Sequence, residues 1–259
     1  MAGALKSTCE GATLILTLSN PAFKNALGPE IYTAGIEALS AAETNPDIRS
    51  IVIVGDGTIF SVGGDLHRLQ ENLKQLPEVQ AQSIDGFHSW IECIRTYPKP
   101  VIAAVEGAAA GAGFALALAC DFCVAADNAV FVMAYSAVGL SPDGGATWAL
   151  ARALPRQLIS EILMGGQRIS AKRLYDFGLI NILSHAGTAL ADAHKLADQL
   201  NGLAPNVLAS IKELITEAAT QTFSQQLSSE RDHFVRNLHH GNGAEGISSF
   251  LEKRIPHYK

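Results

Sequence analysis

Apolar runs and turn residues divide the first part of the chain into alternating strands and helices. Three short apolar runs have the length and character of buried strands, and they cover residues 13–18, 50–54 and 101–105. Between these runs, apolar positions recur at helical spacing from Pro29 toward Asn45, and again over Ile84–Tyr97. This alternation predicts a core of the α/β (α+β) class.

The pattern changes after about residue 150, where strand signals become rare and Ile180–Leu183 is the last plausible one. Four helical patterns follow it: Ala189–Leu200, Val207–Ala219, Phe223–Leu238 and Ala244–Lys253. Helices without a sheet to cover usually pack on one another or on a second subunit. We therefore expect a core over residues 1–188, carrying the site, and a helical oligomerisation region over residues 189–259.

Charge and hydropathy exclude several classes of protein. The 259 residues include 19 Lys and Arg against 25 Asp and Glu, a formal net charge of −6 with no basic stripe, which argues against a nucleic-acid surface. The most apolar stretch, Gly107–Ala119, is shorter than the ~20 residues that a membrane helix needs. Met1–Glu10 lacks the pattern of a secretion signal. A cytoplasmic enzyme without nucleic-acid or membrane partners is expected.

The cysteines are too few and too scattered for a disulfide framework. Cys120 and Cys123 have the spacing of a redox or zinc motif, but no second Cys or His pair stands at ligand spacing. The segment is typical of a buried strand start, where these residues simply pack. Neither a metal site nor a separate cofactor is expected.

The first of three segments with chemical potential is Phe60–Leu66, which follows an apolar strand. Its adjacent Gly63 and Gly64 permit a backbone geometry that turns an N–H group outward. Asp65 can then cap the helix that follows. A plain strand–loop–helix connection would give the same pattern.

The second segment, Glu106–Ala115, is rich in Gly and Ala and also follows an apolar strand. A helix that begins near Gly111 presents free N–H groups, among them that of Ala112, together with the positive end of its dipole. Such an end stabilises an anion or a developing oxyanion. The alternative is a closely packed Gly/Ala helix. The segment matches neither a dinucleotide-binding motif nor a P-loop.

The third segment, Gly139–Gly145, places Asp143 between Pro142 and two glycines. A carboxylate there is either a helix N-cap or a functional base. Together the three segments suggest two converging N–H donors and one carboxylate. This set of groups can stabilise an enolate while a proton moves.

The chain resembles the enoyl-CoA hydratase/isomerase (crotonase) superfamily along essentially its whole length. Besides the three segments, the resemblance rests on Asn20–Leu27, Lys99–Gly107, Ala119–Asp121 and Gly246–Arg254, in the order and spacing of the family. It implies a spiral core of ββα turns and C-terminal helices that mediate trimers, often paired as hexamers. It also implies an acyl-CoA thioester as substrate.

The resemblance assigns roles to single residues. It implies that the N–H groups of Gly64 and Ala112 polarise the thioester carbonyl. Around them, it implies a substrate site with Val62, Gly63, Asp65, Leu66 and Gly111. Coenzyme A phosphates and adenine would contact Lys24 and the backbone near Ala22 and Ala26, and a neighbouring subunit's coenzyme A would contact Phe250 and Lys253.

The departures from the family pattern concern the acid–base groups. Hydratases of the family use two glutamates, and the matching positions hold Ala115 and Tyr135. A methyl group cannot act as a base, and a phenol with a pKa near 10 is a poor one at neutral pH. Asp143 occupies the position of the proton-shuttling acid of the family's isomerases. Its surroundings resemble the ring-epoxide/oxepin-CoA isomerases of phenylacetate degradation.

The sequence therefore predicts an acyl-CoA isomerase that shifts a double bond, or opens a strained ring, with Asp143 as its single proton shuttle. A hydratase with an atypical site is the first alternative. Nucleophilic attack by Asp143, in dehalogenation or thioester hydrolysis, is a second, and a non-catalytic acyl-CoA-binding homologue is a third. The roles of His67, His88 and Glu106 stay open. The poorly patterned stretch Gln70–Phe87 is interpreted as a mobile lid.

Overall fold

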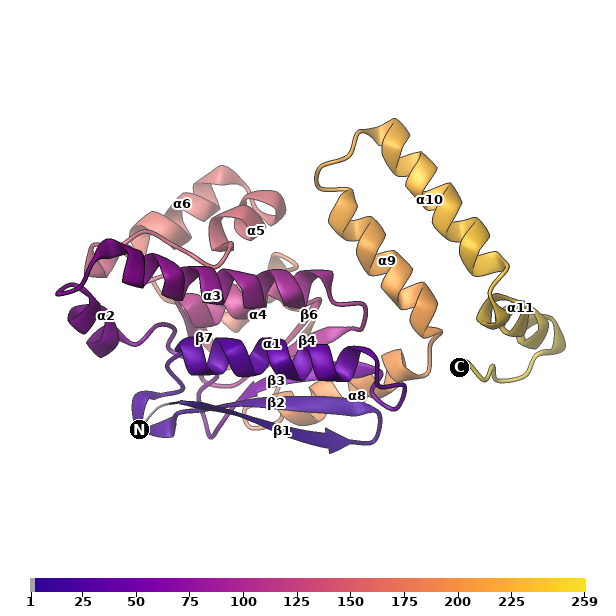
Figure 1. Ribbon diagram of the computed structural model, residues 1–259, viewed down its shortest axis with the longest axis horizontal. Helices are drawn as coiled ribbons and strands as arrows, with labels where there is room; N and C mark the ends of the chain where they lie inside the picture. Colours follow the sequence, from indigo (N-terminus) through magenta and orange to yellow (C-terminus); the bar gives the residue numbers. More distant parts are fainter. Residues whose placement is uncertain (1–2) are drawn as a thin grey trace.

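The computed structural model describes residues 3–259 and is built around a six-stranded sheet (Figure 1). The strand order is β1-β2-β3-β4-β6-β9, and every neighbouring pair is parallel except the antiparallel β1 and β2. The strands span Ala4–Glu10, Thr13–Ser19, Ser50–Gly55, Val101–Val105, Phe122–Ala126 and Ile182–Ser184, in that order. A smaller sheet joins β5, β7 and β8, which span Ala108–Ala110, Val130–Val132 and Ile169–Ser170. The predicted α/β class is confirmed.

The central strands β3 and β4 are apolar at nearly every position because helices cover both faces of the sheet. All residues of β3 and β4 are buried. On one face lie α1 (Pro29–Glu43) and α3 (Pro77–Thr96), and on the other lies α8 (Ala189–Asn201), as Figure 1 shows. Three small buried side chains of α8, those of Ala189, Ala193 and Ala197, pack on this face, and partly buried leucines of the same helix pack beside them.

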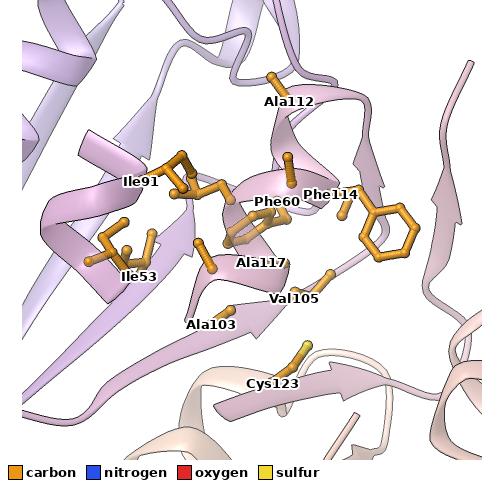
Figure 2. Packing of buried hydrophobic residues seen from close by; sticks show 14 of the residues in the cluster. Ile53, Phe60, Ile91, Ala103, Val105, Ala112, Phe114, Ala117 and Cys123 are labelled. Atoms are coloured by element: carbon orange, nitrogen blue, oxygen red, sulfur yellow. The ribbon is translucent and has the colours of Figure 1, made fainter. Parts of the chain in front are cut away.

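Helix α4 (Ala112–Ala119) is buried on nearly all sides. Figure 2 shows Ala112 at the start of this helix, with Ala117 further along it and above Ala103 and Val105 of β4. Close packing of small side chains therefore fixes where α4 begins and where its first N–H groups lie.

The region interpreted as a lid is largely helical, because α2 covers Leu66–Asn72 and α3 already begins at Pro77. Asp65 caps α2 as expected, since its carboxylate accepts hydrogen bonds from His67 N at 2.9 Å and Arg68 N at 3.4 Å. The remaining helices before α8 are short: η1 (Pro21–Phe23), η2 (Ser136–Val138), α5 (Ala146–Ala153), α6 (Arg156–Gly165) and α7 (Ala171–Asp176).

The last three helices form a group at one side of the molecule (Figure 1): α9 (Pro205–Glu217), α10 (Phe223–Leu238) and α11 (Gly241–Glu252). The chain end packs back on them, because Asn242 accepts a hydrogen bond from Lys259 N and donates one to Lys259 O. The proposed boundary after residue 188 stays a prediction. Helix α8, which follows it, packs on the sheet. Over residues 3–259, no helix has the length and apolarity that crossing a membrane requires.

Candidate active site

Hydrogen bonds from three parts of the chain hold the turn at Gly63 in place. Leu27 N donates a hydrogen bond to Gly63 O at 2.7 Å, and Ala110 N donates to Ser61 O at 2.9 Å. The buried Ser61 hydroxyl donates to Asn25 O at 2.7 Å and accepts from Gly63 N at 3.1 Å. The main chain that leads into Gly64 is therefore fixed by buried hydrogen bonds.

Gly63 brings this turn against the start of α4. Its φ of +87° is a conformation that L side chains rarely adopt. A methyl group on Gly63 would lie 2.5 Å from Ala110 O and 2.9 Å from Ala112 N, whereas one on Gly64 would meet open space. In the part of the chain that the structure describes, neither Gly64 N nor Ala112 N donates a hydrogen bond. We call these two free N–H groups the amide pair.

A cavity of about 510 Å³ lies in front of the amide pair. The sequence-predicted residues that line it are Val62, Gly64, Asp65, Leu66, Gly111, Ala112 and Asp143. Much of the remaining lining is apolar and comes from Leu69, Ile84, Phe87, Val138 and Leu140. The structure therefore brings the three predicted catalytic residues to one cavity.

Tyr135 and Asp143, which we call the acid pair, also line this cavity. Tyr135 OH donates a hydrogen bond to Asp143 Oδ1 at 2.5 Å. Burial, followed by the charge of Asp143, raises the pKa of Tyr135 above its ordinary value, so the phenol keeps its proton and can donate. A methyl group on Gly111 would lie 3.6 Å from Tyr135 OH, so the acid pair adjoins the amide pair.

Asp143 is not a helix cap. Helix α5 begins at Ala146, its N-cap is Gly145, and no side chain caps it. Over residues 3–259, Asp143 Oδ2 accepts no hydrogen bond from another side chain or from a main-chain N–H group. The interpretation of Asp143 as a functional carboxylate therefore fits the structure, and the interpretation as a cap does not.

The turn after Asp143 packs closely on α3 and α4. Gly144 has a φ of +62°, and a methyl group there would overlap the Phe87 ring and lie 2.9 Å from the Ala115 methyl. Gly144 N donates to His88 Nε2 at 3.2 Å, which gives His88 a positioning role. Ala115 is thus a packing residue beneath this turn, and the two hydratase glutamate positions hold no carboxylate.

Several predicted substrate contacts lie outside the cavity lining. Ala22 and Lys24 are exposed, and Ala26 is buried. Phe250, 83% exposed, and Lys253 lie at the end of α11. Their predicted contacts with coenzyme A stay predictions.

Among the cavity residues that the sequence analysis did not single out are Tyr32, Arg68 and Ser83. Arg68 donates a hydrogen bond to the Ser83 hydroxyl. Burial raises the pKa of Tyr32 above its ordinary value. Each lies on a helix with an ordinary pattern, and only the packing of α1, α2 and α3 brings them together.

Two further acidic residues, Glu106 and Asp121, have structural roles. Glu106 accepts hydrogen bonds from Gly187 N at 3.1 Å and Ala189 N at 2.8 Å, and so holds the start of α8. Asp121 accepts from Val101 N at 2.8 Å and from Lys212 Nζ at 2.6 Å. Among the described residues, no three His, Cys, Asp or Glu side chains form a group that could hold a metal ion. The absence of a separate cofactor stays a prediction.

Comparison with known proteins agrees with this geometry. Residues 8–259 match the family model described as Enoyl-CoA hydratase/isomerase. The chain is 35% identical over 254 residues to 1,2-epoxyphenylacetyl-CoA isomerase of Escherichia coli (strain K12), with 97% of both chains covered. It is 32% identical over 246 residues to 2,3-dehydroadipyl-CoA hydratase of the same strain, with 95% of this chain and 94% of the relative covered.

A solved structure gives the same result at higher identity. An enoyl-CoA hydratase from Polaromonas sp. JS666 superposes with a TM-score of 0.99 at 71% identity, covering 99% of this chain and 100% of the other. Sequence and fold thus match these proteins over nearly the whole chain. The protein belongs to the enoyl-CoA hydratase/isomerase family of the crotonase superfamily, whose members act on acyl-CoA thioesters.

Proposed function

We propose that this enzyme is an isomerase that moves a double bond within an unsaturated acyl-CoA, with Asp143 as its only acid–base group. The observation that carries the proposal is that Asp143 shares one cavity with the amide pair. The two positions at which hydratases of the family carry glutamates hold Ala115 and Tyr135, and neither supplies a second carboxylate.

The proposed reaction begins with the thioester oxygen at the N–H groups of Gly64 and Ala112. Each donor to a developing oxyanion stabilises the transition state by ~3 kcal/mol. With a 3-enoyl-CoA, Asp143 removes a proton from Cα, and the electron pair spreads through a dienolate to the thioester oxygen. Asp143 then returns the proton to Cγ, which leaves the double bond between Cα and Cβ. No water is consumed.

Tyr135 supports this role by holding one oxygen of Asp143. Its hydroxyl donates to Oδ1 and leaves Oδ2 for the proton that moves. A hydrogen bond to a carboxylate is stronger than one between neutral groups and restricts its rotation. The acid pair therefore acts as one base with a fixed direction.

A strained cyclic CoA ester is a second substrate that the same groups could process. Ring opening next to a thioester also develops negative charge on the carbonyl oxygen, which the amide pair would bind. The relative with 35% identity is called 1,2-epoxyphenylacetyl-CoA isomerase, and this supports including such an ester among the substrates to be tested.

Hydration is the rival function, and the name of the protein with 71% identity favours it. A hydratase must activate water and also protonate Cα, so Asp143 would have to perform both tasks. The isomerase needs only one proton carrier, which is the number of carboxylates that this cavity offers beside the amide pair, apart from the capping Asp65.

The two functions are separated by assaying 3-hexenoyl-CoA, crotonyl-CoA and 1,2-epoxyphenylacetyl-CoA with the wild type and Asp143→Asn. We expect the wild type to isomerise 3-hexenoyl-CoA, and the variant to be slower by about 10²–10⁴. Asp176→Asn, at an exposed acid outside the cavity, is the matched control. Hydration of crotonyl-CoA by the wild type at a higher kcat/KM than isomerisation of 3-hexenoyl-CoA would overturn the proposal, and so would appreciable hydration that survives Asp143→Asn.

Exchange of the Cα protons of a bound saturated acyl-CoA in D₂O tests the remaining alternatives. A proton shuttle predicts exchange that depends on Asp143. No exchange above background would favour a non-catalytic acyl-CoA-binding protein. A covalent adduct trapped on Asp143 would favour a nucleophilic reaction.

We also propose that the chain assembles into trimers through its C-terminal helices. Exposed apolar side chains on these helices and just after α11 support this proposal: Phe223, Phe234, Phe250, Leu251 and Ile255. Burying such side chains between subunits would offset the cost of exposing them to water. Light scattering gives the mass in solution, and a monomeric mass at micromolar concentration would contradict the proposal.

A further inference from the structure

A positive charge lies in the cavity where the proposed isomerase mechanism does not use one. Arg68 of α2 lines the same cavity as Gly64 and Asp143 and donates a hydrogen bond to the hydroxyl of Ser83 on α3. The hydroxyl is neutral, so it satisfies one N–H group without balancing the charge. Much of the neighbouring lining is apolar, and a guanidinium in such a place favours an anionic ligand.

Arg68 forms no ion pair with a protein carboxylate among residues 3–259. Glu30, at the exposed start of α1, is a neighbouring carboxylate. A methyl group on Gly28 would lie 3.0 Å from Arg68 Nη1 and 3.1 Å from Glu30 Oε2, so the two side chains are on the same side of Gly28 without pairing. The guanidinium thus remains available to a carboxylate that enters the cavity.

Tyr32 connects Arg68 with the reacting end of the cavity. This tyrosine lines the cavity although it is only 6% exposed. Burial raises the pKa of its phenol, the charge of Arg68 opposes that rise, and the charge of Asp143 adds to it. Tyr32, Arg68 and Asp143 thus line one cavity, and the phenol keeps its proton and can donate to an anion.

We propose that Arg68, together with Tyr32 and Ser83, binds a carboxylate at the far end of the acyl group. The preferred substrates are then CoA esters of short dicarboxylic acids. The proposal rests on the proposed function only in that the thioester oxygen lies at the amide pair. A guanidinium only donates hydrogen bonds and a protonated phenol can donate one, so they match a carboxylate better than a methyl terminus.

Binding is tested with two saturated esters of equal length, adipyl-CoA and hexanoyl-CoA, which differ only in the terminal carboxylate. Calorimetry on the wild type should show adipyl-CoA bound about 10- to 100-fold more tightly, the range of a charge-assisted hydrogen bond. Arg68→Gln should abolish that preference and leave the affinity for hexanoyl-CoA within about twofold. Arg168→Gln, at an exposed arginine outside the cavity, should retain the preference.

Equal binding of both esters by the wild type would overturn the inference. Equal weakening of both by Arg68→Gln would do so as well, because Arg68 would then bind a coenzyme A phosphate. If Arg68→Gln unfolds, Arg68→Lys takes its place: it keeps the charge but loses the planar fork, and should reduce the preference without abolishing it. A preference for adipyl-CoA that Arg68→Lys leaves at its wild-type size would also overturn the inference.

A parallel assay keeps the inference separate from the proposed reaction. The wild type is given 3-hexenedioyl-CoA and 3-hexenoyl-CoA. Isomerisation of neither ester would contradict the proposed function, while the calorimetric preference would still decide the role of Arg68. Isomerisation of both at equal kcat/KM, with equal affinities for the saturated esters, would leave the isomerase standing and remove the carboxylate subsite.

Discussion

The amide pair and the acid pair share one cavity but are built differently. Gly64 and Ala112 contribute main-chain N–H groups at two strand–helix corners, which buried hydrogen bonds and the packing of α4 hold in place. Tyr135 and Asp143 contribute side chains from the loop between β7 and α5, and their bond to each other orients them. The fold thus determines where a thioester oxygen is stabilised, whereas the identity of two side chains determines which proton moves.

The largest effect on this comparison is expected from Gly63→Ala, which changes the amide pair without touching a reacting atom. The added methyl would overlap Ala110 O and press on Ala112 N, at a φ that alanine rarely adopts. Loss of one donor costs about 10²–10³ in rate, so isomerisation and Cα exchange should fall together by that amount. Both are measured beside Gly165→Ala, where the methyl has room. Near-wild-type rates in a folded Gly63→Ala protein would contradict the conclusion that this turn determines where the thioester oxygen is stabilised.

A smaller and more selective effect is expected from Tyr135→Phe. The change removes the donor to Asp143 Oδ1 and leaves the amide pair in place. Isomerisation should slow by about tenfold, the order of a single hydrogen bond to a charged group, while the affinity for hexanoyl-CoA stays constant. Steady-state kinetics and calorimetry measure the two quantities. The control is Tyr175→Phe, at an exposed tyrosine. Equal loss of affinity and rate would mean that Tyr135 binds the acyl group instead.

The smallest effect on rate is expected from Ser61→Ala, which tests the support behind the amide pair. The change removes the hydrogen bonds that the buried Ser61 hydroxyl makes with Asn25 O and Gly63 N. The free energy of unfolding should fall by ~1–3 kcal/mol, since each unsatisfied buried group loses its hydrogen bond. Urea unfolding measures this against Ser89→Ala, at an exposed serine. An unchanged free energy would show that other contacts suffice to hold the turn.

Much of the fold could be predicted because its strongest patterns are local. Strand β4 and helix α10 lie at their predicted bounds, the first because a doubly covered strand is continuously apolar and the second because its apolar positions recur regularly. Strand β1 was missed, since it is an edge strand whose residues are mostly exposed. Strand β8 is only two residues long and depends entirely on its neighbour β7.

The site was predictable to the extent that it depends on glycine-rich corners and on the family resemblance. The bond between Tyr135 and Asp143 could not be predicted, because it depends on how the Gly144 turn packs on α3 and α4. Arg68 was missed for a similar reason. It lies two residues before the stretch Gln70–Phe87, where the sequence has no special pattern, and its place in the cavity follows from the packing of α2 on α3.

A point mutation exchanges a side chain but keeps the peptide N–H of the same residue, unless the new residue is proline. The oxyanion donors of Gly64 and Ala112 are therefore carried by every sequence that still folds with this turn geometry. Single-codon changes at Tyr135 or Asp143 would leave these two oxyanion donors intact. A lineage can thus pass from one thioester reaction to another in small steps, without first losing the ability to hold an enolate.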